Sequence, residues 1–293
     1  MRRFVDLHTH STASDGALAP AQIVRLAEGK RLAAVALTDH DTTAGIEEAQ
    51  AAAREFPSLR LVAGMEVSAA WPAGVMHILA LGIDPQAPAL RQLAEVLLAA
   101  RDERNPKIIA RLQALGLAID MDDVRTELGP ASARLSHPVI GRLHIAAALR
   151  RKGYARDIAD AFDRFIGGKA PAFVDKEKLP PRSVVAAIKR SAALAILAHP
   201  PQLYYADRAE LERILRDLMD EGLDGLEVYH TDHRAEQTRL YLELARKFSL
   251  GVTGGSDFHG RAKPDATLGR PLVPISAMSE DFARRLLGRE PLS

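Results

Sequence analysis

The sequence contains no cysteine among its 293 residues. This absence excludes disulfides and thiolate zinc sites, so imidazole and carboxylate groups are the strong metal ligands that remain. An excess of charge of one sign is also absent, because 39 lysines and arginines face 38 aspartates and glutamates. No global basic field is therefore available for nonspecific nucleic-acid binding. An anionic substrate must be bound by local charge.

Long hydrophobic runs are lacking as well. No apolar run is long enough to span a bilayer, and the N-terminus reaches charged residues too early to contain a signal peptide. We therefore expect a cytoplasmic protein that has no membrane association and no obligate protein partner. The hydrophobic content of 47% supports a sizeable core.

Short apolar runs alternate with segments of helical period, a pattern that predicts βα units and a largely parallel sheet. The predicted strands are residues 4–7, 33–37, 59–62, 76–81, 194–198, 225–228 and 250–253. The predicted helices are residues 20–28, 43–55, 182–190, 208–221 and 234–247. Seven strands with intervening helices indicate an α/β barrel.

The strand pattern disappears between residues 90 and 175, where amphipathic helical stretches replace it. These stretches are residues 107–115, 138–151 and 156–166. We predict a helical insertion that closes over one rim of the barrel as a substrate cap. The predicted division is residues 1–98 for the first part of the barrel, 99–176 for the insertion and 177–293 for the second part.

Polar residues lie in the predicted strands or just beyond their C-terminal ends, the rim that carries the active site in β/α barrels. His8 and His10 are two residues apart, so their rings project from one face of an extended strand. Asp257 and His259 repeat this spacing in a glycine-rich loop. The other candidates for the rim are Asp15, His40, Glu66, His77, His199 and His230.

Each of these residues also has an ordinary structural interpretation. His8 and His10 are compatible with a half-exposed strand, and Asp39 beside His40 with a helix N-cap. Glu66 is compatible with a solvated side chain, and His77 or His199 with a hydrogen-bonded core histidine. Asp15, next to Gly16, suits a turn. The coincidence of so many ligands on one rim favours a site for several divalent metals.

The motifs resemble those of the PHP family, named for polymerase and histidinol phosphatase domains. They are DLHTHS at residues 6–11, TDHDT at 38–42, Glu66 after the third strand, His199-Pro200, and GSDFHG at 255–260. The resemblance implies a distorted (β/α)7 barrel with a helical insertion domain and a metal-dependent hydrolase of phosphate esters.

The resemblance also implies two or three divalent metal ions. His8, His10, Glu66 and Asp257 would hold the first metal. Glu66, His77 and His199 would hold the second, with Glu66 bridging, and Asp15, His40 and His259 would hold the third. Many relatives have histidine where this chain has Asp15, and a carboxylate favours harder ions. We therefore expect Mn²⁺, with Mg²⁺, Zn²⁺ or Fe²⁺ as alternatives.

Within the family, the insertion and the phrases RNPKI at 104–108 and GRLHIA at 141–146 resemble the subgroup of 3′,5′-nucleoside bisphosphate phosphatases and 5′–3′ exoribonucleases. The expected reaction is removal of the 3′-phosphate from a nucleoside 3′,5′-bisphosphate, with Asp257 and His230 in catalytic roles. The alternatives are nucleotide release from the 5′ end of short RNA, histidinol phosphate hydrolysis, and a noncatalytic module that binds nucleic acid.

A second phosphate requires cations outside the metal site, where arginine binds bidentately and lysine acts as a point charge. The insertion supplies Arg101, Arg104 and several further candidates, although any one of them is compatible with a solvated helix face. The predicted substrate-binding residues are Lys107, Arg134, His137, Arg142, His144, Lys176 and His230.

Overall fold

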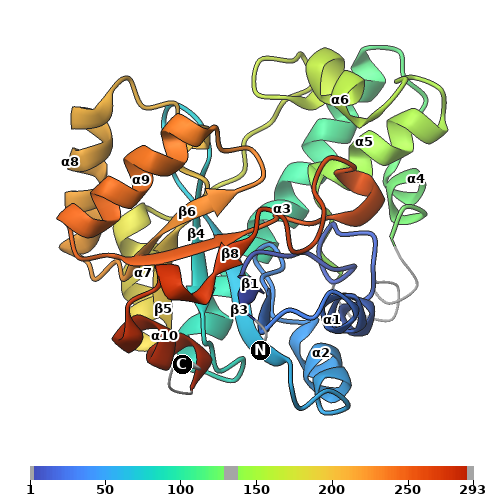
Figure 1. Cartoon of the computed structure of the whole chain (residues 1–293). Coiled ribbons are helices and arrows are strands. Elements are labelled where there is room, and N and C mark those ends of the chain that lie inside the picture. Colours follow the sequence, from blue (N-terminus) through green and yellow to red (C-terminus); the bar gives the residue numbers. More distant parts are fainter. Residues whose placement is uncertain (1–2, 129–137, 289–293) are drawn as a thin grey trace.

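The computed structural model describes residues 3–128 and 138–288, which form a mixed α/β barrel with helices around it (Figure 1). The strands are β1 (Phe4–Asp6), β2 (Ala34–Leu37), β3 (Arg60–Ala69), β4 (Met76–Leu81), β5 (Leu194–Leu197), β6 (Gly225–His230), β7 (Gly251–Gly255) and β8 (Val273–Pro274). They form one sheet in the order β7-β6-β5-β4-β3-β2-β1-β8.

Helices cover the strands and form the insertion. They are α1 (Pro20–Gly29), α2 (Ile46–Ala53), α3 (Pro88–Ala114), α4 (Met121–Arg125), α5 (Arg142–Arg151), α6 (Ile158–Ala161), α7 (Pro181–Arg190), α8 (Arg208–Met219), α9 (Ala235–Lys247) and α10 (Glu280–Leu287). Shorter turns are the π-helical η2 (Phe162–Ile166) and the 3₁₀ segments η3 (Pro200–Leu203), η4 (Gly260–Ala262) and η5 (Ile275–Ala277).

The sequence accounts for these elements through simple patterns. All residues of β2 and β5 are buried, as expected for strands covered on both faces. Helix α7 begins with Pro181, whose fixed φ suits the first helical position, and buries Val184, Val185 and Ile188 on one face. The α/β barrel is thus as predicted, and α1, α2, α7, α8 and α9 correspond to predicted helices, whereas α10 was not predicted and α3 begins well before the predicted residue 107.

The barrel closes where β1 meets β7. Leu7 donates its backbone N–H to Gly254 (3.0 Å), and Asp257 donates its own to His8 (2.9 Å). A Cβ on Gly255 would lie 2.4 Å from the His8 Cβ, so this close approach requires glycine. The two ends of the chain that carry the DLHTHS and GSDFHG motifs are therefore hydrogen-bonded neighbours.

Two features of the sheet differ from the prediction. Strand β4 pairs antiparallel with both β3 and β5, so the sheet is mixed and no helix separates β3 from β4. A short eighth strand, β8, pairs antiparallel with β1. A strand buried on both faces carries no sequence signal for its direction, and a two-residue strand has no recognisable period.

The helical insertion has a hydrophobic core of its own, which includes Ile108, Leu112, Ile145, Leu149 and Ala172. Its helices α4, α5 and α6 gather at one end of the molecule, and α10 lies at the other (Figure 1). The predicted boundary between residues 98 and 99 falls inside α3. Leu90, Leu93 and Leu97 at the start of this helix belong to the barrel core. One continuous helix therefore connects the two parts.

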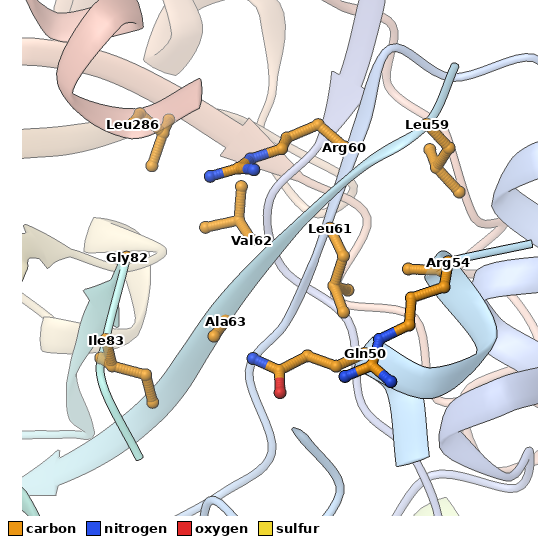
Figure 2. Close-up of a pocket in the computed structure, with 11 residues that line it drawn as sticks. Gln50, Arg54, Leu59, Arg60, Leu61, Val62, Ala63, Gly82, Ile83 and Leu286 are labelled. Atoms are coloured by element: carbon orange, nitrogen blue, oxygen red, sulfur yellow. The ribbon is translucent and has the colours of Figure 1, made fainter. Parts of the chain in front are cut away.

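A cavity of about 570 Å³ lies at the start of β3, between α2, β3 and α10. Gln50 and Arg54 extend from α2 toward it, and Arg60 and Leu286 lie on the other side (Figure 2). The described residues that line it include no histidine and no carboxylate, so the cavity is separate from the predicted rim.

Within the described ranges, no helix is both long and apolar enough to cross a lipid bilayer.

Candidate metal centre and its cavity

His8 and His10, in the extended segment that follows β1, direct their Nε2 atoms toward the same two carboxylates. His10 Nε2 lies 3.2 Å from Glu66 Oε2 and 3.2 Å from Asp257 Oδ1. His8 Nε2 lies 3.4 Å and 3.5 Å from the same two oxygens. The four side chains are buried and their ligand atoms lie within 4.8 Å of one another. This is the arrangement predicted for the first metal.

Glu66, in the middle of β3, is the centre of the cluster. Its Oε1 lies 2.6 Å from His77 Nδ1 and 3.0 Å from His199 Nε2. Its Oε2 lies 2.8 Å from His40 Nδ1. The two oxygens of one carboxylate thus face different sets of imidazoles, which is the geometry that a bridging ligand requires.

Asp15 connects the remaining two histidines. Its Oδ1 lies 3.3 Å from His259 Nε2 and its Oδ2 lies 3.8 Å from His40 Nε2. One ligand atom from each of these three residues and one from His10 lie within 4.8 Å of one another. The structure therefore brings all nine predicted ligands together. They form the metal cluster: His8, His10, Asp15, His40, Glu66, His77, His199, Asp257 and His259.

The donor atoms of the metal cluster fit divalent ions. Buried atoms without a hydrogen-bond partner among the described residues include His8 Nε2, His10 Nε2, Asp15 Oδ1 and Glu66 Oε2. Buried polar atoms are normally paired, because an unpaired one costs free energy. Mixed nitrogen and carboxylate donors suit manganese, iron and zinc.

Positive backbone φ angles also gather at this rim. Asp41, His199 and Asp257 have φ values of 56°, 22° and 51°, although none of them is glycine. Such conformations cost energy and are concentrated at functional sites. At Asp257 the turn directs the carboxylate toward His8 and His10.

Protonation of the metal cluster opposes metal binding. Burial lowers the pKa of His10, but Asp257 and Glu66 outweigh this effect and raise it to about 10. Burial lowers the pKa of His77 to about 4, so this imidazole is neutral. Because a ligating imidazole must be unprotonated, a metal bound at His10 would displace a proton from it.

We therefore expect Mn²⁺ binding at about pH 7 to release at least one proton per protein, and metal affinity to fall as the pH falls. Titration calorimetry in two buffers with different ionisation enthalpies measures this release. An observed enthalpy that is equal in both buffers would contradict the prediction.

Glu227 is a residue of the site that the sequence analysis missed. It is fully buried in β6, its Oε1 lies 3.0 Å from His8 Nδ1, and its Oε2 accepts the backbone N–H of His199 (2.7 Å). Burial raises its pKa, but His8 and His230 outweigh this effect and hold it at about 2. An acidic residue inside an apolar strand was the available signal, because a buried charge needs a partner.

A bulge in β6 explains how Glu227 and His230 both reach the cluster. Residues three apart point to opposite faces of a regular strand, but the pairing of β6 with β7 shifts between Glu227 and Tyr229. His230 Nε2 then lies 3.6 Å from Asp257 Oδ2, and its Nδ1 accepts the N–H of Asp232 (3.1 Å).

Replacement of Glu227 by glutamine is expected to weaken metal binding about 10–100-fold, the usual effect of losing a carboxylate that orients a ligating histidine. Competition with a fluorescent chelator measures the affinity. Glu243→Gln, an exposed residue paired with Arg208, serves as the control. Unchanged affinity in Glu227→Gln would show that His8 needs no support from this carboxylate.

A cavity of about 470 Å³, called here the rim cavity, opens onto the metal cluster. It is lined by Asp15, His40, Ser68, Val75, His77, Arg101, Arg104, Arg142, Leu143, Phe162, Val174, Asp175, Lys176, Lys178, Gln202 and Lys263. Metal ligands and cations from both the barrel and the insertion thus share one space.

Arg104 and Arg142 are the cations of the rim cavity that lack an ion pair with any described carboxylate. Arg104 is buried and bonds only the side-chain oxygen of Asn105 among the described residues. Arg142 lies between the rings of Phe162 and Phe173, 5.6 and 5.5 Å from their centroids. Burial, with Arg101 and Arg142 nearby, lowers the pKa of Arg104 to about 9. Guanidinium groups without an ion-pair partner favour the binding of an anionic group such as phosphate.

The other predicted substrate-binding residues occupy different places. Lys176 lines the rim cavity, whereas Lys107 is exposed on α3 and pairs with Glu103 (2.5 Å). His144 lies in a smaller cavity of about 90 Å³, between α5 and the loop that carries Asp15. His230 is buried beside Asp257 and is not part of the described cavity lining. Arg134 and His137 lie outside the described residues.

Lys263 was not predicted, although it follows the GSDFHG motif closely. Its Nζ lies 2.9 Å from Asp257 Oδ2 and 2.8 Å from Asp232 Oδ2, and it lines the rim cavity. Burial lowers its pKa, but Asp257 and Asp232 outweigh this effect and raise it. It is a permanent positive charge beside a candidate metal ligand.

Comparisons with known proteins agree with this geometry. The family model for the PHP domain matches residues 6–123. A 3′,5′-nucleoside bisphosphate phosphatase of Chromobacterium violaceum is 33% identical over 92% of this chain and 93% of its own length. A 5′–3′ exoribonuclease of Haemophilus influenzae is 32% identical over 88% of this chain and 91% of its own.

A solved structure from Bifidobacterium adolescentis, assigned as a metal-dependent phosphoesterase, has the same fold. Its TM-score is 0.85 at 33% sequence identity, and the match covers 98% of this chain and 96% of that one. The similarity therefore extends over the barrel and the insertion together.

Proposed function

The chain belongs to the PHP family and is a metal-dependent phosphoesterase, and from this premise we propose that it removes the 3′-phosphate from nucleoside 3′,5′-bisphosphates. The products are a nucleoside 5′-monophosphate and inorganic phosphate. Adenosine 3′,5′-bisphosphate is the proposed test substrate. The proposed location is the cytoplasm.

One observation carries the choice of a bisphosphate. The rim cavity is lined by Asp15, His40 and His77 of the metal cluster and by two arginines, the buried Arg104 and the half-buried Arg142, that make no ion pair with a described carboxylate. Asp175 lies in the same wall but pairs with Lys178 (2.9 Å). A substrate with two phosphates can place one at the metal cluster and the other at the arginines, where each bond to an ionised group contributes about 1.5–3 kcal/mol.

We assign the metal ligands as three overlapping sets. His8, His10, Glu66 and Asp257 would hold one ion, and Glu66, His77 and His199 would hold a second. Asp15, His40 and His259 would hold a third, for which the Asp15 carboxylate favours Mn²⁺. When bound, such ions would supply Lewis-acid charge and lower the pKa of water toward neutrality.

The protein groups around this centre have distinct proposed roles. Burial raises the pKa of Asp257, but His259 and His8 outweigh this effect and hold it well below its usual range, so the carboxylate is ionised. It can therefore bind metal and accept a hydrogen bond from the attacking water. His230 carries its proton on Nε2, because its Nδ1 accepts from Asp232, and that proton is directed toward Asp257. Lys176 lines the same cavity wall, where burial lowers its pKa to about 7.

A second candidate function is stepwise hydrolysis of short RNA from its 5′ end. The similarity to the Haemophilus influenzae exoribonuclease supports it, at nearly the same identity as the phosphatase. Both reactions use the same metal chemistry on phosphorus and differ in the leaving group. Neither relative named above is a histidinol phosphatase, and the convergence of the ligand set argues against a noncatalytic binding role.

Phosphate release from a substrate panel tests the proposal. The panel contains adenosine 3′,5′-bisphosphate, adenosine 3′-monophosphate, short 5′-phosphorylated RNA and histidinol phosphate, each with Mn²⁺, Mg²⁺ or Zn²⁺. We expect the highest kcat/KM with the bisphosphate and Mn²⁺, and loss of activity in Asp257→Asn. Equal kcat/KM for bisphosphate and 3′-monophosphate would contradict a second-phosphate site, and preferred cleavage of RNA would favour the exoribonuclease.

A further inference from the structure

A single buried carboxylate, Asp41, binds two cations at the junction between the barrel and the insertion. Its Oδ2 accepts from Arg101 Nε (2.8 Å) and Nη2 (2.6 Å), and Lys176 Nζ contacts the same oxygen. All three side chains are buried. Buried charges of this kind need an oppositely charged partner and satisfied hydrogen bonds, and removal of the shared carboxylate would leave two cationic groups without theirs.

Arg101 and Lys176 lie on the two connections of the insertion to the barrel. Along α3, Leu97 belongs to the barrel core and Ile108 to the insertion core, and Arg101 lies between them. On the return path, Ala172 belongs to the insertion core, and Leu179 accepts the backbone N–H of Ala70 (2.8 Å) in the barrel. Lys176 lies between these two. The Asp41 carboxylate therefore contacts both of the connections between the barrel and the insertion.

The local backbone explains why Asp41 can reach both cations while its neighbour serves the metal cluster. Its φ of 56° is a conformation that aspartate tolerates better than most residues. His40 then contacts Glu66, whereas Asp41 Oδ1 accepts the backbone N–H of Ser68 (2.9 Å). The Asp41 carboxylate therefore also contacts β3, at a residue two positions after Glu66.

Asp41 is connected to Arg104 and Arg142 through α3. Arg104 is one helical turn beyond Arg101 on α3, so the two side chains share a face of the helix. The next residue, Asn105, donates its side-chain N–H to the carbonyl of Ile140 (3.0 Å), just before α5 and Arg142. Contacts thus continue from Asp41 through α3 to both arginines.

We propose that Asp41 is a positioning residue that fixes both connections of the insertion to the metal rim, and so holds Arg104 and Arg142 at the distance from the metal cluster that a bisphosphate requires. This inference rests on the proposed function. Asp41 itself touches no substrate. Its effect is transmitted through Arg101 and Lys176.

The test uses the full-length Asp41→Asn variant, because asparagine keeps the shape, the tolerated φ and an acceptor for Ser68 but removes the charge. We expect the KM for adenosine 3′,5′-bisphosphate to rise at least about tenfold with kcat nearly unchanged, since a small misplacement of binding groups is costly. The KM for adenosine 3′-monophosphate should change much less. Amide exchange should accelerate in residues 99–114 and 172–178, with the metal content equal to that of the wild type.

Several outcomes would overturn the inference. Unchanged exchange and unchanged bisphosphate KM mean that the insertion needs no such anchor. Loss of metal together with equal losses on both substrates means that Asp41 acts through His40 instead. Glu103→Gln, an exposed change on the same helix, is the matched control and should alter neither measurement.

Two further arms keep the test decisive. If Asp41→Asn fails to fold, amide exchange is measured in Lys176→Met instead. Faster exchange confined to residues 172–178 is then expected. Exchange equal to that of the wild type in these residues would overturn the inference. If the wild type hydrolyses no bisphosphate, the proposed function fails, but amide exchange in Asp41→Asn still decides whether this carboxylate anchors the insertion.

Discussion

Replacement of Glu66 by glutamine is expected to lower kcat/KM for every phosphate ester by at least about 10³-fold, or about 4 kcal/mol of transition-state stabilisation. Its two oxygens face imidazoles on both sides, with His77 at 2.6 Å and His40 at 2.8 Å. Glutamine removes the negative charge and replaces one oxygen by an N–H donor, which cannot bind a cation. Initial rates and metal content by mass spectrometry measure the effect.

The control for this variant is Glu212→Gln. Glu212 is also largely buried, but it pairs with Lys247 and Arg208 on the helical exterior, so wild-type activity is expected. If Glu66→Gln retained both its metal and its activity, a bridging role for this carboxylate would be wrong.

The second large effect concerns Arg104 and Arg142. Changing both to glutamine is expected to lower kcat/KM for adenosine 3′,5′-bisphosphate by about 10²–10³-fold, since each arginine provides charge-assisted bonds of about 1.5–3 kcal/mol. The value for adenosine 3′-monophosphate should change little, because that substrate has no second phosphate. The preference for bisphosphate would then nearly disappear.

Steady-state kinetics on the two substrates measures this preference. Arg125→Gln is the control, because Arg125 is exposed on the insertion and paired with Asp122 (2.6 Å). A double variant that lost activity equally on both substrates would place the arginines in the chemistry of the metal centre rather than in a second-phosphate site.

The metal cluster could be predicted from the sequence because its residues occur in patterns that survive without tertiary information. His8 and His10 share a face of an extended segment by their spacing, and Asp257 and His259 lie in a glycine-rich turn after a strand. Glu66 was different, because its surroundings suit a solvated glutamate equally well. Its assignment depended on the resemblance to the PHP family, and in the structure imidazoles lie beside both of its oxygens.

The missed parts of the site depend on packing between distant segments. Arg104 and Lys107 lie on one helix, and their sequence context is similar. Arg104 is buried in the rim cavity, whereas Lys107 is exposed, because the docking of the insertion determines which face of α3 is covered. The direction of β4 and the bulge in β6 likewise follow from neighbouring strands. Glu227 alone had a local signal, as a charge within an apolar strand.

Anomalous diffraction at the manganese edge, from crystals of this chain grown with Mn²⁺, tests the central claim most directly. The proposed assignment predicts anomalous peaks on both sides of the Glu66 carboxylate, one shared with His8, His10 and Asp257 and one with His77 and His199. Bound manganese elsewhere, or a Glu66 carboxylate with no peak beside it, would contradict the claim that these side chains form one metal centre.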